Sequence, residues 1–324
     1  MARIALTLAL VLAAGTAAAD VAEAVDVVTP AYADLARRSA ALAEAAAVDC
    51  NPETLRPAFQ DAWDAWARID FLRLGPVETD GRALAIAFWP DAKSSGLRAQ
   101  QAVLNAGAAI ADRPEEFAQA SVAMRGLPAL ERLLYPSTLE GAEAELCRLT
   151  RATANDLAQT AEKVAAEWPA HAALLTAPGG ANTTYLAETE ARQALFTQLV
   201  TGLTTLETLR LGRPLGSFDK PRPERAEAAA SERSLRNVVQ SLTGMRDLAL
   251  ALHPDAPQTR AAFDRALDLA ASLDDPVFAG VADPQGRLKV EILQQAVAAA
   301  RVAVESELGP ALGVSAGFNA RDGD

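Results

Sequence analysis

Histidine and cysteine are scarce in this chain of 324 residues, which contains two of each. Histidine is the commonest metal ligand and general base in proteins, so its scarcity limits the sites that can be assembled for that chemistry. No His-Glu-x-x-His or Cys-x-x-Cys segment occurs, so the ligand sets of ordinary zinc hydrolases are missing. His171 and His253 fall at predicted helix ends, where a cation interacts favourably with the helix dipole.

Aromatic residues make up only 5% of the chain, and runs of β-branched residues are rare. Alanine, leucine, glutamate and arginine are abundant instead, and these are the strongest helix formers. The composition therefore predicts an all-α protein. Its net charge of −12 argues against nucleic-acid binding, because neutralising phosphates requires a basic surface.

Residues 1–19 have the pattern of a cleavable signal peptide. Arg3 supplies the positive start, an apolar stretch runs from Ile4 to Ala14, and three alanines precede a predicted cut after Ala19. The apolar stretch is too short to span a bilayer, and no other segment is apolar enough to do so. We therefore expect an exported protein, located in the periplasm, without a transmembrane segment.

Export makes Cys50 and Cys147 candidates for a disulfide, with two isolated buried thiols as the alternative. Closing a loop of roughly 100 residues would contribute about 4 to 5 kcal/mol by the loop-entropy relation. In an up-down bundle with short connections, the two cysteines would fall at opposite ends of a helix of about 36 Å, which is far beyond the reach of a disulfide. Residues 75–95, which can span about 66 Å when extended, are therefore predicted to run back along the bundle.

The chain is expected to form two four-helix-bundle-like domains, at 20–176 and 184–324, joined by a Pro/Gly linker at 177–183. A Gly-Leu-x-x-Leu-Glu-x-Leu pattern begins at both Gly126 and Gly202 and suggests an internal duplication. A second similarity, between the segments around Arg73 and Arg210, would align the two halves of the chain differently, so the alignment between the halves stays open. Helices are predicted at 21–48, 52–74, 96–111, 114–135, 139–168, 184–211, 224–252, 258–272 and 288–308.

Two carboxylates stand in apolar or aromatic surroundings, Glu131 and Asp91. Oxygen ligands suit hard cations, so an Asp/Glu cluster between helices could bind one. The alternative for Glu131 is a salt bridge with an arginine such as Arg132. For Asp91 the alternative is a helix cap or turn after Pro90.

A small polar stripe, Ser231, Ser234 and Asn237, repeats at intervals of three residues in a helical stretch. Such a stripe either allows two helices to approach closely or lines a polar pocket between the two domains. The stretch from Arg125 to Pro136 contains Pro128 within an apolar stripe, where proline kinks or restarts a helix.

Several short motifs, in order along the chain, together resemble the imelysin family. They are Arg73-x-Gly75-Pro76, Trp89-Pro90-Asp91, Gly126 with Glu131 and Leu133-Leu134, Ser231-x-x-Ser234-Leu235, and the closing Gly-Phe-Asn-x-x-Asp-Gly-Asp. The resemblance implies two four-helix bundles, a site in the cleft between them, and an association with iron uptake or metal handling. It also implies a metal-holding Gly-x-His-x-x-Glu motif, but here Pro128 occupies the histidine position and offers no ligand atom.

The leading hypothesis is a non-catalytic periplasmic binding protein that holds an iron species or a small anion between the two domains. One alternative is a metallopeptidase-like hydrolase whose metal is bound by carboxylates, with Glu131 as the best candidate ligand. Another is a scaffold for periplasmic protein partners in an iron-uptake or redox assembly. The expected ligand-binding residues are Arg73, Trp89, Asp91, Gly126, Glu131, Ser231 and Ser234.

Overall fold

The computed structural model describes residues 21–315, and the regular structure of this part is helical. Apart from the helices it has one isolated antiparallel bridge, between Ser217 and Lys220. No helix within residues 21–315 has both the length and the apolar character needed to cross a membrane. The predicted signal peptide, with its cut after Ala19, and the closing motif at 317–324 lie outside the described residues.

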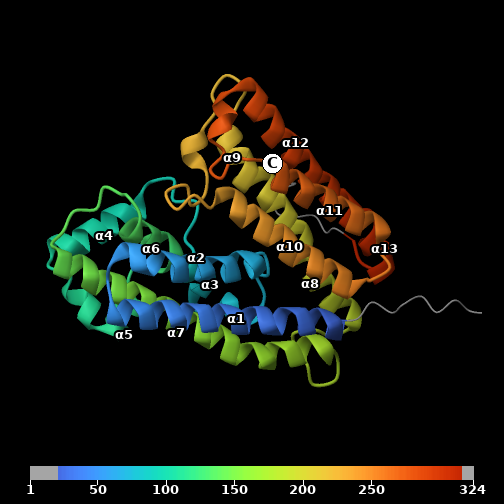
Figure 1. The fold of residues 1–324 in the computed structure, drawn as a ribbon. Helices are drawn as coiled ribbons and strands as arrows, with labels where there is room; N and C mark the ends of the chain where they lie inside the picture. Colours follow the sequence, from blue (N-terminus) through green and yellow to red (C-terminus); the bar gives the residue numbers. More distant parts are fainter. Residues whose placement is uncertain (1–20, 316–324) are drawn as a thin grey trace, which may run out of the picture.

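The N-terminal half consists of three long helices and several short ones (Figure 1). Its α-helices are α1 (Val21–Val48), α2 (Pro52–Ile69), α3 (Arg82–Ile86), α4 (Ser95–Asn105), α5 (Pro114–Ala118), α6 (Gly126–Leu134) and α7 (Glu143–Thr176). Short 3-10 helices occur at Gly75–Val77, Thr79–Gly81, Ala109–Asp112 and Val122–Met124. Figure 1 shows α1, α2 and α7 lying alongside one another.

The C-terminal half is a second group of helices set obliquely on the first (Figure 1). Its α-helices are α8 (Glu188–Thr205), α9 (Gly212–Leu215), α10 (Ser234–Leu252), α11 (Pro257–Ser272), α12 (Pro284–Ala303) and α13 (Gly309–Leu312). Leu206–Leu211 and Val304–Leu308 are π-helical, and Pro223–Arg225 and Ala279–Ala282 form 3-10 turns. The all-α prediction is confirmed.

Local sequence signals set the start of α2 as predicted. The Asn51 side chain accepts a hydrogen bond from the backbone N–H of Glu53 at 2.9 Å, and Pro52 takes the first helical position. Trp63 and Trp66 are each 1% exposed, so this face of α2 is part of the core.

Other helix boundaries differ from the sequence prediction because tertiary packing decides them. Pro169 does not end α7: the helix continues to Thr176, and the burial of Trp168 and Leu175 against the core offsets the lost backbone donor. His171 therefore lies inside a helix and not beyond its end. The expected helix at 114–135 is broken, since Gly126 has φ +67° and α6 starts there, with Pro128 in its first turn.

The main hydrophobic core is continuous across the two halves. Helix α10 packs on α1 and α2, so closely that a Cβ on Gly244 would lie 1.8 Å from the carbonyl oxygen of Arg68. A small second cluster, around Leu104 and Phe117, lies under the short helices. The two separate bundles and the duplication stay predictions. The echoed glycines differ in conformation, since Gly126 has a positive φ and Gly202 lies within α8.

The predicted disulfide and crossover are both confirmed. Cys50 and Cys147 are bonded, with 5.3 Å between their Cα atoms. The connection after α2 begins with Gly75 against the His171 ring, and then Arg82 pairs with Glu167. Because these contacts move from residue 171 toward the start of α7, the segment runs back along that helix, as the bond requires.

Candidate functional site

A cavity of about 120 Å³ lies where the two halves meet, and we call it the central cavity. Such a volume holds several water-sized groups. The N-terminal half contributes residues that end α2 or belong to the connection after it, and the C-terminal half contributes residues of α8, the first π-helix and α10. The wall residues used below are Trp66, Asp70, Arg73 and Trp89 from the first half and Thr201, Arg210, Glu227 and Ser241 from the second.

Arg210 forms the base of the central cavity. It belongs to the π-helix, a local widening that often occurs at functional sites. Its guanidinium pairs with Asp70, lies 2.7 Å from Glu227 through Nε, and donates to the Ser241 hydroxyl. Burial works against the charge of Arg210, but the two carboxylates outweigh it and raise the pKa of this arginine further.

Both carboxylates at the base have polar neighbours besides Arg210. Asn237 donates to Glu227 at 2.9 Å, and the Ser241 hydroxyl, which is 2.7 Å from the carbonyl oxygen of Ala67, lies 3.2 Å from the second oxygen of Asp70. The base is therefore a hydrogen-bonded cluster that joins α2 to the first π-helix, to α10 and to the loop before it. Such a cluster fixes the position of one half on the other.

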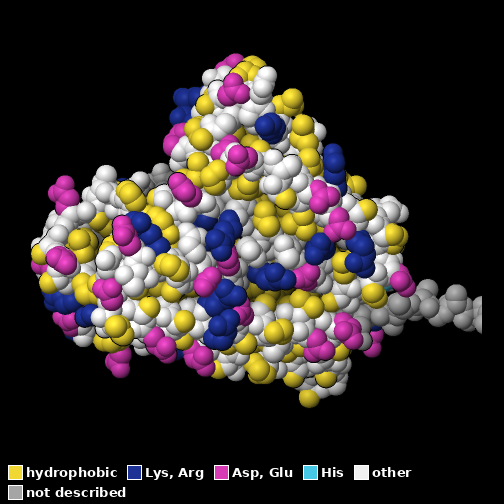
Figure 2. Space-filling view, viewed as in Figure 1, with side chains coloured by type: hydrophobic (Ala, Val, Ile, Leu, Met, Phe, Trp, Pro, Cys, Tyr) yellow, Lys and Arg dark blue, Asp and Glu magenta, His cyan; other side chains and the backbone are white. Residues whose placement is uncertain are grey.

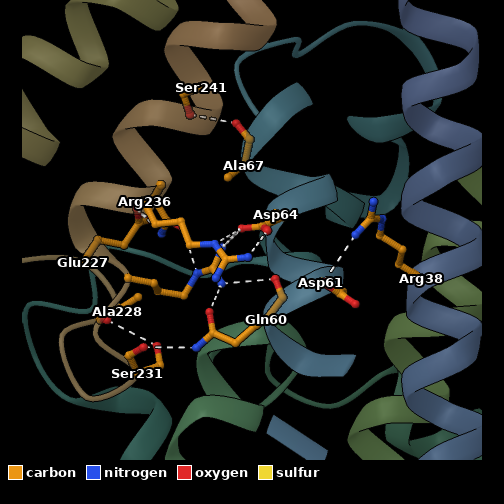
Figure 3. A network of polar contacts seen from close by, with 12 residues as sticks. Arg38, Gln60, Asp61, Asp64, Ala67, Glu227, Ala228, Ser231, Arg236 and Ser241 are labelled. Carbon is orange, nitrogen blue, oxygen red and sulfur yellow. Dashed lines mark hydrogen bonds and ion pairs between the residues drawn. The ribbon is translucent and has the colours of Figure 1, made fainter. Parts of the chain in front are cut away.

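A second polar network continues from this cluster along the interface (Figure 3). Arg233 is completely buried and bonds Asp64 at 2.8 Å, Asn237 at 2.9 Å and Gln60. Burial lowers the pKa of Arg233, although Asp64 opposes the effect. Figure 3 shows Asp64 facing Arg236 as well, and this hydrogen bond is the main cause of the raised pKa of Arg236.

Charged pairs also cross the boundary at the surface. Arg68 of α2 pairs with Asp247 of α10 at 2.6 Å. On the face in Figure 2, Lys and Arg side chains gather near the line where the two groups of helices meet, interspersed with acidic ones. The overall negative charge of the protein is thus locally offset along this boundary.

Glu131 is bound by Ser231 and not by an arginine. Its Oε1 accepts from the backbone N–H of Ser231 at 2.9 Å and from the hydroxyl at 2.6 Å. Within residues 21–315 Glu131 makes no ion pair, and Arg132 instead donates to Gln100 and to the carbonyl of Ala123. Burial raises the pKa of Glu131, and the hydrogen bonds from Ser231 only partly counter it. This contact ties α6 to the loop before α10.

Asp91 is a helix cap. It accepts hydrogen bonds from the backbone N–H groups of Ser95 and Gly96 at 2.8 and 2.7 Å, so the cap alternative is confirmed. Burial works against its charge, but these N–H groups and Arg132 hold the pKa of Asp91 below its usual value. Asp91 and Glu131 therefore have separate partners.

The remaining predicted residues divide between cavity and scaffold. Arg73 and Trp89 both line the central cavity. Ser234 Oγ donates to the carbonyl of Glu227, which shapes the loop before α10. At Gly126 a Cβ would lie 2.2 Å from two carbonyl oxygens of the 82–86 helix end, so only glycine fits this approach.

Sequence reasoning missed Arg210, Glu227 and Thr201 as wall residues of the central cavity. One signal was present: Arg210 stands between two leucines in a helical stretch, and such an arginine requires a buried partner. The second sequence similarity placed it opposite Arg73, and both residues do line the cavity. Glu227 carried no comparable signal, since it lies in an alanine-rich stretch.

The metal that the family motif implies does not fit these side chains. Pro128 offers no ligand atom, and one oxygen of Glu131 is held by Ser231. Asp70 and Glu227 are engaged by Arg210 and its neighbours. Among residues 21–315 no three His, Cys, Asp or Glu side chains are grouped to hold a metal ion. We derive no metal-dependent step.

The imelysin sequence family matches residues 28–304, which is most of the chain. The chain belongs to the imelysin family. Solved structures show the same fold: an imelysin-like protein from Psychrobacter arcticum aligns with a TM-score of 0.71 at 21% identity, over 93% of this chain and 99% of that one. The resemblance found from short motifs is therefore confirmed.

One curated relative of this imelysin-family chain and one further solved structure of the same fold carry names that refer to iron. Iron-regulated protein A of Synechococcus elongatus is 24% identical over 314 residues, covering 88% of this chain and 83% of its own. The structure of an iron-regulated protein A precursor from Parabacteroides distasonis aligns with a TM-score of 0.69 at 12% identity, over 91% of this chain and 97% of that one.

Proposed function

We propose that this protein is a non-catalytic periplasmic binding protein of iron handling, which holds an iron species in the central cavity. The observation that carries the proposal is the cavity itself, because both halves build its wall around two tryptophans and a fixed arginine. Ligand sites commonly combine apolar walls with a few placed polar groups at the boundary between domains. The names of the two relatives support the link to iron.

Export to the periplasm is supported by the signal-peptide pattern of residues 1–19. The relative from Parabacteroides distasonis is named a precursor, which is consistent with processing of that protein. The Cys50–Cys147 disulfide suits an oxidising compartment. Each of these observations is independent of the cavity.

Binding is favoured over hydrolysis by what the carboxylates already do. Glu131, the best candidate ligand for a hydrolytic metal, accepts two hydrogen bonds from Ser231. Asp70 and Glu227 are paired with Arg210. These contacts give the three carboxylates a structural role at the interface between the halves, which favours binding over hydrolysis.

The proposal is tested by filling the cavity from its rim. Thr201 lines the cavity and is exposed on α8, so Thr201→Trp would occupy the entrance without disturbing the core. Thr208→Trp is the matched control, since Thr208 is exposed one or two turns further on and does not line the cavity. Calorimetry with ferric citrate and with ferrioxamine B provides the readout.

We expect a ferric complex to bind the wild type and Thr208→Trp equally and to lose its binding to Thr201→Trp. If neither ferric complex binds to the wild type, the proposal is refuted, and a scaffold that uses this surface for protein partners is favoured instead. Equal binding by all three proteins would place the ligand elsewhere and would also refute it.

A further inference from the structure

The arginines near the central cavity fall into two groups. Arg210 and Arg233 donate to several protein acceptors, and Arg236 is bound by Asp64 through two of its nitrogens. Arg73 and Arg213 do not share this saturation. Each of the two lies over the face of a tryptophan that lines the cavity, and Arg73 is itself a wall residue.

Arg73 has a free hydrogen-bonding edge. Its guanidinium carbon lies 5.2 Å from the centre of the Trp66 ring, and its one charged neighbour, Glu78, is 3.6 Å away. Within residues 21–315 the Arg73 guanidinium donates no hydrogen bond, although its side chain is only 37% exposed and lines the cavity. Stacking on the indole fixes its plane while leaving its donors available.

Arg213 lies over the other tryptophan but is not a wall residue of the cavity. Its guanidinium carbon lies 5.7 Å from the centre of the Trp89 ring, and Trp89 itself lines the cavity. The Nε of Arg213 is buried and has no hydrogen-bond partner in the described part of the chain. Because this nitrogen is closed to a ligand, Arg213 is placed to hold the Trp89 ring and not to bind a ligand itself.

We propose that the ligand of this cavity is a carboxylate anion, and that iron arrives as its chelate, held by Arg73 beside the Trp66 indole. The inference rests on the proposed function and names its ligand class. A guanidinium on an aromatic ring presents a planar fork that matches a carboxylate with two parallel hydrogen bonds. Arg73 on the cavity wall therefore selects an anion that carries a carboxylate.

The cavity carboxylates favour an anion over a free cation. Asp70 and Glu227 direct their oxygens to Arg210, Ser241 and Asn237, so they are not available to coordinate a metal. The unsatisfied groups are donors, and these recognise oxygens that the ligand brings. Iron in this site would keep the ligands of its chelate.

The test measures affinity for iron-free citrate, ferric citrate and the cationic complex ferrioxamine B. Arg73→Gln is compared with Arg246→Gln, whose ion pair with Asp264 lies outside the cavity. We expect Arg73→Gln to bind citrate and ferric citrate about 10- to 100-fold more weakly, since a charge-assisted hydrogen bond is lost. Arg246→Gln should bind as the wild type does.

Arg73→Lys separates the charge of the side chain from its fork geometry, and it should bind with intermediate affinity because lysine lacks the planar fork. Melting temperatures of all variants close to that of the wild type would show that folding is preserved. The inference would be overturned if ferrioxamine B bound as tightly as ferric citrate, or if Arg73→Gln bound ferric citrate normally while Thr201→Trp did not. That last pattern would leave the proposed function intact, whereas absence of any ferric binding would remove both.

Discussion

Replacing Arg210 by methionine should destabilise the protein more than any other single arginine change at the interface. The substitution leaves Asp70 and Glu227, 6% and 4% exposed, buried without their cation. Breaking a buried ion pair by removing one partner costs about 3–5 kcal/mol. With roughly 2–4 °C lost per kcal/mol, the melting temperature of Arg210→Met should fall by about 6–20 °C.

The matched control is Arg236→Met, which removes another arginine that bridges α10 and α2. Its side chain is 47% exposed, and Arg233 remains on Asp64, so the expected loss is about 0–1 kcal/mol. Urea unfolding followed by far-ultraviolet circular dichroism measures both variants.

A compensated variant checks the cause. Arg210→Met combined with Asp70→Asn and Glu227→Gln removes every charge of the cluster, so most of the lost stability should return. A loss in Arg210→Met no larger than in Arg236→Met would refute the argument that this buried cluster holds the two halves together. Failure of the triple variant to recover any stability would assign the loss to packing.

Three further perturbations test separate features. Cys50→Ala with Cys147→Ala opens a link across 97 residues and should cost about 4–5 kcal/mol in urea unfolding; a loss below about 1 kcal/mol would contradict this. Because burial raises the pKa of Glu131 above 4.5, the folded protein binds that proton more tightly than the unfolded chain, so the wild type loses stability as the pH rises through the raised value. Glu131→Gln should therefore gain stability relative to the wild type as the pH rises above 4.5, and a difference independent of pH would refute the assignment. Gly126→Ala should lower the melting temperature well beyond Gly81→Ala, because both have φ +67° but only Gly126 has carbonyl oxygens 2.2 Å from the added Cβ; equal effects would show that the backbone adapts.

The sequence predicted those features of the fold that depend on neighbouring residues. Helix formers and the Asn51-Pro52 start place α1 and the beginning of α2 where the structure has them. The disulfide was predicted from the even number of cysteines in a chain expected to be exported. The returning connection was predicted because a bond between the two cysteines requires it and residues 75–95 are long enough to provide it. Pro169 was misread because the packing of Trp168 and Leu175 against distant helices, which no local pattern records, keeps α7 intact.

The site was harder to predict because its groups come together only through contacts between the halves. Arg73 and Trp89 were identified through the resemblance, and both line the cavity. The partner of Glu131 is 100 positions away, at Ser231, so local sequence pointed to an arginine instead. Arg210 pairs with Asp70 across 140 positions, and that pairing depends on how the first π-helix packs against the end of α2.

Anomalous diffraction at the iron absorption edge, from crystals grown with ferric citrate, tests the central claim most directly. The account predicts one strong iron peak in the central cavity, between Trp66, Trp89 and Thr201, with carboxylate density on Arg73. An iron peak coordinated directly by Glu131, or bound only on the outer surface, would contradict it.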